Sequence, residues 1–485
     1  MLRSRIKNPP TTKSRFLAGP GRLVANAIKN SVILILIMCV LVTAAGCGPV
    51  IPATDNLMRP PRAGDSGKDI LDALEEDLGM QFTLRYPMRG ERRSAVIRVD
   101  LNGDGTDEAI VLYHLAGERS RPRIAVMSKD SGWHMAGSVT YSGNNSKNVS
   151  EIDRVMFADL DGGGNPEMIV GWAASAGDNC FFSAYRYAED QIIGIPVPEI
   201  YAEYTELCFG DFGGGGRQDL IAAVVDRQTG AAAANVLRYN QESLYLSEIC
   251  PLDGGAIGVS YAVTGEISPE LGAVILGIQQ KSGCVVPEIL VWDGSAQKLR
   301  RLTPEGISHS DENHPADIDG DGFLEAPSDI MFDYYTDIAD IEPIYLTTWL
   351  KIDISGEFSE AGNRIHFWRE QFSLSCPAGW LNTVIPVREK SESDRVIYFY
   401  RNNGGTPGEE IFRIRMFSHD AWSALEPLDA VGGFGFREDD SPRFEMLGEN
   451  SHAVFACMIA ERQPADEMNI TFEAILASFR VESGF

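Results

Sequence analysis

Residues 99–113 read VDLNGDGTDEAIVLY, an acidic stretch followed directly by a run of apolar residues. Counted from Asp100, side-chain oxygens occur at positions one, three, five and nine, and Gly105 at position six permits a sharp turn. The run that follows is rich in residues that favour β-strands. The stretch therefore predicts a tight acidic connection between two strands.

The same pattern recurs four more times along the chain. The five copies are DLNGDGTDEAIVLY from Asp100, DLDGGGNPEMIVGW from Asp159, DFGGGGRQDLIAAVV from Asp211, GEISPELGAVILG from Gly265 and DIDGDGFLEAP from Asp317. Successive copies begin 59, 52, 54 and 52 residues apart, a period close to one four-stranded propeller blade. Because such a unit cannot bury its faces alone, we expect the copies to stack against one another.

The repeats predict a mainly β fold, a five-bladed calcium-loop β-propeller followed by a smaller α+β domain. The strand FTLRY at residues 82–86 is expected to complete the last blade and so close the ring. An open arc, or a sixth blade without a recognisable loop, remains an alternative.

Oxygen ligands at alternate positions of a curled loop suit Ca²⁺, which binds six to eight oxygens in a flexible shell. The first and fifth loops provide the best ligand sets, in which the residue at position seven contributes its backbone carbonyl: Asp100, Asn102, Asp104, Thr106 and Glu108, and Asp317, Asp319, Asp321, Phe323 and Glu325. Gly163 replaces the position-five ligand in the second loop, which predicts a weaker site made by Asp159, Asp161, Asn165 and Glu167. The third loop keeps Asp211 and Asp219, and the fourth keeps no acidic ligand where one is needed.

An EF-hand shares the first half of this pattern but requires a glutamate at position twelve, where these loops have Val111 and Ser328. The loops instead resemble those of FG-GAP or VCBS-type repeats, the blades of integrin-like β-propellers. The resemblance covers roughly residues 95–330. It implies structural Ca²⁺ that stiffens the blades, and partners that bind the faces of the propeller. Degenerate copies favour a structural role as well, because a glycine turn can persist after the charges are lost.

The N-terminus has the order of parts expected of a bacterial lipoprotein signal. Seven basic residues and no acidic ones occur in residues 1–46, and the apolar run SVILILIMCVLVTAA ends just before Gly46 and Cys47. The segment from Ala44 to Cys47 resembles a lipobox, although Ala44 stands where leucine is usual. We therefore expect lipidation at Cys47 and anchoring to the extracytoplasmic face of the cell membrane, with an uncleaved anchor or an ordinary secretory signal as alternatives.

These features divide the chain into four parts. Residues 1–46 are expected to be the signal peptide, 47–67 a lipidated cysteine with a flexible tether, 68–370 a short helix and the propeller, and 371–485 an α+β domain of unknown role. The tether is rich in Pro, Gly and Asp. Apolar residues at helical spacing predict the short helix over 68–78, and two further helices are expected near 419–426 and 468–481.

The net charge of −27 makes nucleic-acid binding a poor hypothesis, because an acidic surface repels phosphate. Six cysteines lie beyond Cys47, and buried free thiols are favoured over disulfides, whose pairing the sequence does not select. His309 and His314 flank the fifth loop, but their spacing suits no metal pair and predicts surface histidines. Four tryptophans either line a carbohydrate-binding face or, more often, pack between blades: Trp172, Trp292, Trp349 and Trp368.

No GxSxG, HExxH, GxxxxGK[ST] or CxxC motif occurs in the sequence. The sequence therefore favours binding of a protein or an envelope glycan through a propeller face over catalysis. The alternative is a cell-surface glycoside hydrolase or another hydrolase with a carboxylate pair in the propeller cavity.

Overall fold

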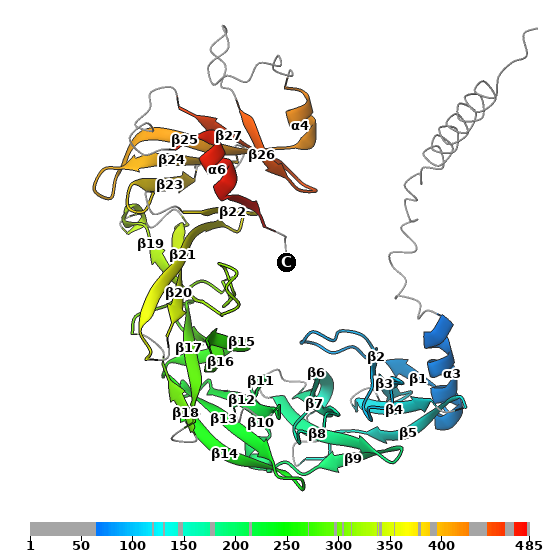
Figure 1. The fold of residues 1–485 in the computed structure, drawn as a ribbon. Coiled ribbons are helices and arrows are strands. Elements are labelled where there is room, and N and C mark those ends of the chain that lie inside the picture. The colour runs from blue at the N-terminus through cyan, green and yellow to red at the C-terminus, as the bar shows by residue number, and fades with distance from the viewer. Residues whose placement is uncertain are drawn as a thin grey trace, which may run out of the picture. The chain divides into compact units, whose positions relative to one another are not determined.

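The computed structural model describes residues 65–482 apart from internal gaps (Figure 1). The gaps are 119–120, 130, 144–148, 175–179, 213–215, 270, 295–297, 303–304, 312, 337, 339–341, 354, 377–379, 389–394, 426–443 and 461–469. The expected signal peptide, Cys47 and nearly all of the tether lie outside the described residues.

The chain is mainly β, as the sequence predicts, and its described strands form six antiparallel sheets. The first sheet contains β1 (Phe82–Leu84), β2 (Val96–Val99), β3 (Glu108–Leu115), β4 (Arg123–Lys129) and β5 (Trp133–Val139). The second contains β6 (Val149–Ala158), β7 (Glu167–Ala174), β8 (Cys180–Ala188), β9 (Gln191–Ile195) and β10 (Glu203–Tyr204). The third contains β11 (Glu206–Gly210), β12 (Asp219–Asp226), β13 (Ala231–Tyr239) and β14 (Leu244–Pro251).

The remaining three sheets are also antiparallel. The fourth contains β15 (Ala256–Ser268), β16 (Leu271–Gln280), β17 (Val285–Asp293) and β18 (Lys298–Arg301). The fifth contains β19 (Ala326–Met331), β20 (Tyr345–Ile352), β21 (Phe358–Phe367), β22 (Phe372–Ser375) and β28 (Phe479–Val481). The sixth contains β23 (Val384–Arg388), β24 (Val396–Asn402), β25 (Pro407–Phe417), β26 (Glu445–Glu449) and β27 (Val454–Ile459), and in it β27 lies between β25 and β26.

Each sheet packs against the next one along the chain. In the second and fourth sheets the central strand is apolar on both faces. In β7, Val170 and Trp172 pack with the first sheet, whereas Ile169 packs with the third. In β16, Leu276 packs with the third sheet and Ile275 with the fifth. Successive strand residues point to opposite faces, so one apolar run contributes to two separate cores.

Short helices cover parts of this framework. α3 (Asp65–Leu78) buries Ile70 and Leu74 against Val111 and Tyr113 of the first sheet, which agrees with the helix predicted over 68–78. α4 (His419–Ser423) and α6 (Phe472–Ser478) lie within the two helical segments expected near the C-terminus. Two 3₁₀ turns are η1 (Glu199–Tyr201) and η2 (Asp333–Tyr335). Among the described residues, no helix combines the length and apolar character needed to cross a membrane.

The expectation that residues 82–86 complete the last blade is wrong. β1 pairs with β3 of the first sheet, with Phe82 opposite Leu115. The edge of the fifth sheet is extended instead by β28, which pairs with β22 (Figure 1). Strands β22 and β28 both lie beyond the expected domain boundary at residue 371, so the fifth sheet contains residues from both sides of that boundary.

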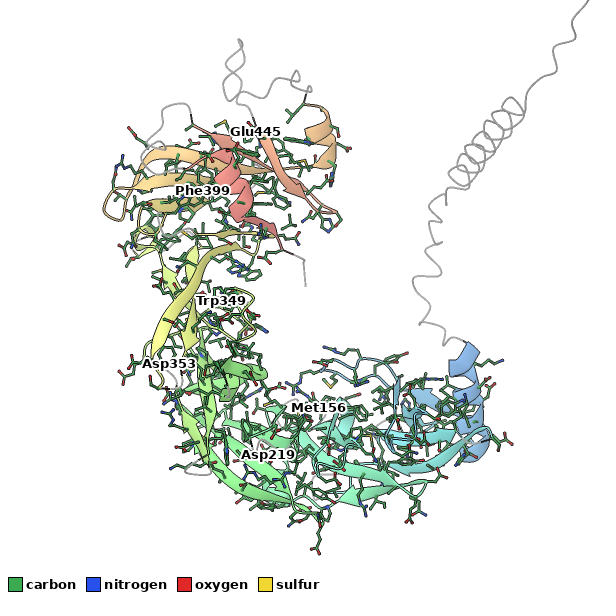
Figure 2. The ribbon with its side chains drawn as sticks, viewed as in Figure 1. Met156, Asp219, Trp349, Asp353, Phe399 and Glu445 are labelled. Carbon is green, nitrogen blue, oxygen red and sulfur yellow. The ribbon has the colours of Figure 1, made fainter. Side chains whose placement is uncertain are left out.

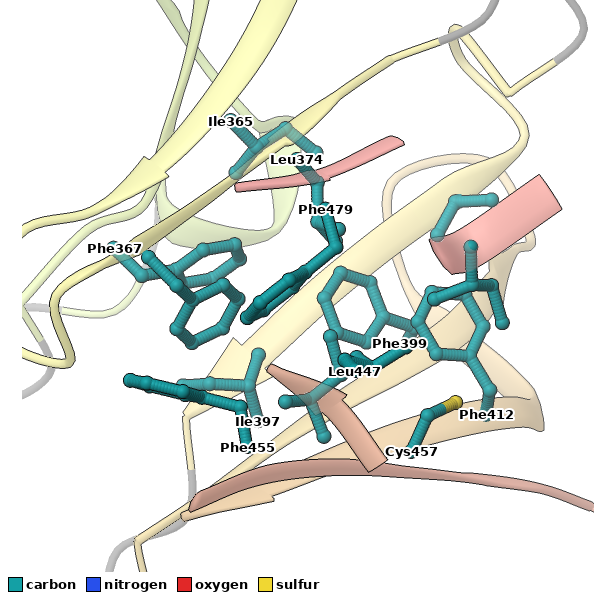
Figure 3. Packing of buried hydrophobic residues seen from close by; sticks show 14 of the residues in the cluster. Ile365, Phe367, Leu374, Ile397, Phe399, Phe412, Leu447, Phe455, Cys457 and Phe479 are labelled. Carbon is teal, nitrogen blue, oxygen red and sulfur yellow. The ribbon is translucent and has the colours of Figure 1, made fainter. Parts of the chain in front are cut away.

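An aromatic core joins the fifth and sixth sheets. Phe372 and Phe479 stack at 5.5 Å between ring centroids, and Phe399 stacks on Phe412 at 4.1 Å (Figure 3). All these rings are at least nine-tenths buried. The two sheets therefore share one hydrophobic core, which includes α6 through Ile475.

Most of the cysteines, and His309, are shielded from solvent. All six cysteines in the described residues are free thiols, and only Cys284 is exposed. His309 is 2% exposed, so the prediction that it lies on the surface is wrong. Its Nε2 lies 2.8 Å from the Tyr261 hydroxyl, because a strand from the fourth sheet packs over it.

Candidate functional site: the acidic loops

The acidic loops occupy the same connection in successive sheets. Loop one (100–108) joins β2 to β3, loop two (159–167) joins β6 to β7, loop three (211–219) joins β11 to β12, and loop five (317–325) precedes β19. The fourth copy differs, because Gly265 lies inside β15 and Ser268 already pairs with Leu271 of β16. The fourth connection is therefore a tight hairpin with no acidic loop.

The first aspartate of each complete loop organises the backbone. Asp100 accepts hydrogen bonds from the amides of Gly103 at 2.7 Å and Gly105 at 2.9 Å. Asp317 accepts from Gly320 at 2.7 Å and Gly322 at 2.9 Å. Loop two repeats both bonds through Asp159, with Gly162 and Gly164 as donors.

The donors at positions four and six are glycines because their backbone is left-handed. Gly320 and Gly322 have φ angles of 82° and 91°, which side chains other than glycine rarely adopt. Gly103 is further restricted, because an added Cβ would lie 2.4 Å from Oδ1 of Asn165 in the neighbouring loop. The sequence reading noted the position-six glycine but missed the one at position four, although its DxxG spacing was visible.

The glutamate at position nine is buried at the start of the following strand. Glu108, Glu167 and Glu325 are 2%, 5% and 0% exposed. One carboxylate oxygen of each accepts the amide of the second loop residue, at 2.8, 2.8 and 2.9 Å. Burial, together with the neighbouring aspartates, raises the pKa of Glu108 and Glu325, and raises that of Glu167 to about 7.

Loop five gathers four carboxylates around one point. Asp317, Asp319, Asp321 and Glu325 each place an oxygen within 4.8 Å of the others. Oε1 of Glu325 is buried and accepts no hydrogen bond. A buried acceptor without a hydrogen bond that faces three more carboxylates fits a hard cation, which would take that oxygen as a ligand.

Loop two gathers Asp159, Asp161 and Glu167 within the same 4.8 Å limit. The side chain of Asn165 points out of this loop, and its Nδ2 donates to the backbone carbonyl of Asn102 at 3.1 Å. Only its backbone could therefore serve the ligand role expected at position seven. Asn165 instead connects loop two to loop one.

Loop one holds its predicted ligands in a hydrogen-bonded arrangement. Nδ2 of Asn102 donates to Asp104 at 3.0 Å and to Glu108 at 3.4 Å. The amide of Thr106 donates to Asp104 at 2.7 Å, and Phe323 makes the matching bond to Asp321 at 3.0 Å in loop five. These bonds curl the chain at position seven, where both backbone carbonyls were expected to act as ligands.

A basic side chain on an adjacent strand lies against each of two loops, a feature that was not predicted from the sequence. Arg238 of β13 donates from Nε at 3.1 Å to Asp219 of loop three, a buried residue labelled in Figure 2. In loop five, Nζ of Lys351 on β20 lies 2.6 Å from Asp319, contacts Asp321, and lies 4.0 Å from Glu325. The hydrogen bonds to these aspartates raise the pKa of Lys351.

The two basic residues occupy corresponding positions. Arg238 follows Leu237, the partner of Leu220, and Lys351 follows Leu350, the partner of Ala326. Each therefore faces the acidic residue at position nine of its loop from the adjacent strand. At the same place beside loop one the chain has Ser128, which follows the partner of Ala109 and carries no charge. This arrangement could be predicted only once the pairing of the strands was known.

A cavity of about 280 Å³ lies apart from the acidic loops, beside the fifth sheet. We call it the fifth-sheet cavity. It is lined by Ser310, Asn313, Asp329, Glu342, Pro343, Ile344, Tyr345, Thr347, His366, Trp368, Arg369 and Arg388. Of the four tryptophans considered for a carbohydrate-binding face, Trp172 and Trp349 (the latter labelled in Figure 2) are buried at 0% and 4% exposure, and Trp368 lines the cavity. Trp292 packs under Arg238.

Comparison with known proteins finds no family and no curated protein that matches the chain. Solved structures with similar folds include the Dos1 propeller, at 8% identity and a TM-score of 0.29, covering 76% of this chain and 67% of that one. A lectin from Aleuria aurantia, in complex with α-methyl-L-fucoside, has 11% identity, a TM-score of 0.27, and coverage of 68% and 97%. An exotype rhamnogalacturonan lyase has 11% identity and a TM-score of 0.21; this chain spans 61% of it, and the match covers 55% of this chain. At these TM-scores the similarities assign no function to this chain.

Proposed function

We propose that the protein is a bacterial lipoprotein, anchored through Cys47, whose β-propeller repeats are stiffened by Ca²⁺ and bind a protein or an envelope glycan outside the cell membrane. The repeated loop geometry is the observation that supports it most directly. Three loops in different sheets combine the same aspartate, two left-handed glycines and a buried glutamate at one strand connection. The recurrence supports membership of the FG-GAP or VCBS-type repeats and a structural role for the ion.

The ligands follow from the loops. In loop five the ion is held by Asp317, Asp319, Asp321, Glu325 and the carbonyl of Phe323. In loop one it is held by Asp100, Asn102, Asp104, Glu108 and the carbonyl of Thr106. The bound ion neutralises carboxylates that otherwise repel one another across the start of a strand. Loop two offers fewer ligands and binds more weakly.

The alternative function is a hydrolase with a carboxylate pair, and the fifth-sheet cavity is the place in the described residues that favours it. Asp329 and Glu342 both line this cavity. Asp329, however, accepts hydrogen bonds from the Ser310 amide at 2.7 Å and the Thr347 hydroxyl at 2.6 Å, and Glu342 lies 3.4 Å from Arg388. Both carboxylates are engaged by groups of the protein, which does not favour the acid and base roles that a hydrolase requires, so binding is the better supported function.

Calcium is expected to raise the melting temperature of the full chain. A site with Kd of about 10⁻⁴ to 10⁻³ M in millimolar Ca²⁺ stabilises by roughly 1 kcal/mol. Replacing Asp100 and Asp317 together by alanine should abolish the response, measured by calorimetry with Ca²⁺ and with a chelator. The exposed Asp72 of α3 supplies a control, Asp72→Ala, which should respond as the wild type does. An unchanged response in the double variant would overturn the assignment.

Lys351→Met is expected to tighten Ca²⁺ binding at loop five. The tethered ammonium competes with the ion for Asp319 and Asp321, so removing it should lower Kd by roughly two- to five-fold, the range expected of a solvent-screened pair. Titration calorimetry in an Asp100→Ala, Asp159→Ala background reports on loop five alone. Lys281→Met, at an exposed lysine, is the matched control. Equal affinities for Lys351→Met and its parent would contradict the competition.

A further inference from the structure

The floor of the fifth-sheet cavity is the polar face of the fifth sheet. Asp329 lies opposite Thr347 in the β19–β20 pair, and Tyr345 lies two residues before Thr347, so the three side chains share one face. Leu346, which lies between Tyr345 and Thr347, and its β21 partner Ile365 point to the other face, where they pack in the aromatic core. The cavity is thus built on a sheet whose opposite face is fixed by a packed core.

A hydrogen-bonded cluster holds the cavity floor in place. Asp329 accepts from the amide of Ser310, from the Thr347 hydroxyl, and from Nδ2 of Asn313 at 3.1 Å. Asn313 also donates to Thr347 at 3.1 Å and to Ser310 at 3.2 Å. These hydrogen bonds fix the orientation of each side chain, so a ligand can bind to the remaining polar atoms without a change of side-chain conformation.

Two polar side chains that line the cavity have unused hydrogen-bonding capacity. Asn313 is 3% exposed, and its Oδ1 has no hydrogen-bond partner. The side chain of His366 is 7% exposed; its Nδ1 lies 3.5 Å from Glu482, and its Nε2 has no hydrogen-bond partner. Buried polar atoms without partners are costly, so they mark places where a ligand completes the network.

Aromatic rings line the same space. Trp368 stacks on His366 with 4.5 Å between centroids and an interplanar angle of 9°, and Tyr345 is 37% exposed. Rings of this kind pack against the apolar C–H faces of a sugar, while the tyrosine hydroxyl can donate to or accept from its hydroxyl groups.

The charges at the cavity balance. Arg388 is occupied by Glu370, at 2.8 and 3.1 Å, and by Glu342. The remaining lining charges are Arg369 and Asp329, one of each sign. A charged ligand gains no net attraction from this lining, whereas a ligand whose hydroxyls both donate and accept suits Asn313 and His366.

We infer that the fifth-sheet cavity binds one uncharged sugar residue of an envelope glycan, an assignment that rests on the proposed binding function and specifies its ligand. A volume of about 280 Å³ is at the small end of ligand sites and suits a single sugar ring. The sugar lies against Trp368 and Tyr345 and donates to Oδ1 of Asn313. His366 forms the second polar contact.

The test uses the full chain in detergent micelles and the methyl glycosides of glucose, galactose, mannose and N-acetylglucosamine, with methyl glucuronide as a charged comparison. Saturation-transfer NMR identifies the binders, and titration calorimetry measures Kd. At least one uncharged glycoside should bind. Trp368→Ala should weaken it at least ten-fold, and Tyr345→Phe, which keeps the ring and removes only the hydroxyl, about three-fold.

Two matched variants control for unspecific damage. Trp133→Ala removes a half-buried tryptophan from the first sheet, and Tyr245→Phe removes the hydroxyl of an exposed tyrosine in the third sheet. Both should bind as the wild type does. Binding of the glucuronide alone, binding of none of the glycosides, or unchanged binding by Trp368→Ala and Tyr345→Phe would each overturn the inference.

Cross-linking on intact cells separates this inference from the proposed function. Neighbours captured equally by the wild type and Trp368→Ala, with no glycoside bound, overturn the sugar site and leave the binding function standing. A chain that captures no neighbour yet binds a glycoside through Trp368 supports the sugar site and contradicts a protein partner.

Discussion

Asp153→Ala is expected to destabilise the protein by about 3–5 kcal/mol, because it leaves buried positive charge without its partner. Asp153 is 2% exposed and accepts from Arg89 at 2.8 and 3.1 Å, from Arg154 at 2.9 Å, and from the Tyr204 hydroxyl at 2.7 Å. Burial alone would raise the pKa of Asp153, but the hydrogen bonds from Arg89 and Tyr204 and the charges of both arginines hold it below its usual value.

The network extends over three sheets, which increases the expected loss. Arg89 comes from the segment between β1 and β2, Asp153 and Arg154 from β6, and Glu206 from the start of β11. Arg154 donates to Glu206 at 2.9 Å, and Arg89 lies 3.3 Å from the same carboxylate. Removing Asp153 therefore weakens the contact of the second sheet with both of its neighbours.

Urea unfolding followed by circular dichroism measures the change. Asp72→Ala, at an exposed helical aspartate, should stay within about 0.5 kcal/mol of the wild type. The contribution of Asp153 is present above the ordinary carboxyl pKa of 3.8 and is lost as the pH falls through its lowered folded-state pKa, so the two proteins should converge in stability in acid. A loss of less than 1 kcal/mol at neutral pH would contradict the network's importance (~3–5 kcal/mol expected).

Phe372→Ala should cost about 3–5 kcal/mol, because it opens a cavity in the core that joins the fifth and sixth sheets. Phe372 is fully buried and lies 4.5 Å from Phe367, 5.7 Å from Phe455 and 5.5 Å from Phe479 between ring centroids. These three partners are labelled in Figure 3. These partners come from β21, β27 and β28. The substitution therefore loosens both sheets together.

Whether the fifth and sixth sheets unfold in one transition is a more specific test of Phe372→Ala than the size of the destabilisation. Residues 67–485 form one compact unit, so Phe372→Ala should lower the midpoint for probes in both sheets equally. Tyr245→Ala removes a ring that is 41% exposed and should have little effect. Separate melting of the sixth sheet, with the fifth unchanged, would contradict a shared core.

The features that could be predicted from the sequence are those that depend on residues close together in the chain: turns, strands and the first helix. The turn in loop one depends on Asp100 and on glycines only a few residues away, so the repeated spacing located the connections between strands. Apolar runs identified strands such as β7 because residues in both faces are buried. The helix α3 was predictable because its buried residues Ile70 and Leu74 recur at helical spacing on one face.

Long-range pairing was not predictable in this way. Residues 82–84 read as a strand, but nothing local indicates that they pair with β3 rather than with the fifth sheet. Nothing local to Lys351 indicates that it lies beside loop five, because this position depends on the register of β20 against β19. The fifth-sheet cavity likewise combines residues from 310 to 388, and their meeting depends on the fold.

Strand β28 imposes an order on folding during synthesis. It pairs with β22, from which it is separated by roughly a hundred residues, so the fifth sheet cannot be completed when its other strands are synthesised. Until Phe479 is added, the outer edge of β22 is unpaired and the rings of Phe372 and Phe455 lack their contact with Phe479. A chain shortened before residue 479 would thus leave a sheet edge open to pairing with other chains, and resistance to aggregation would depend on a strand of three residues.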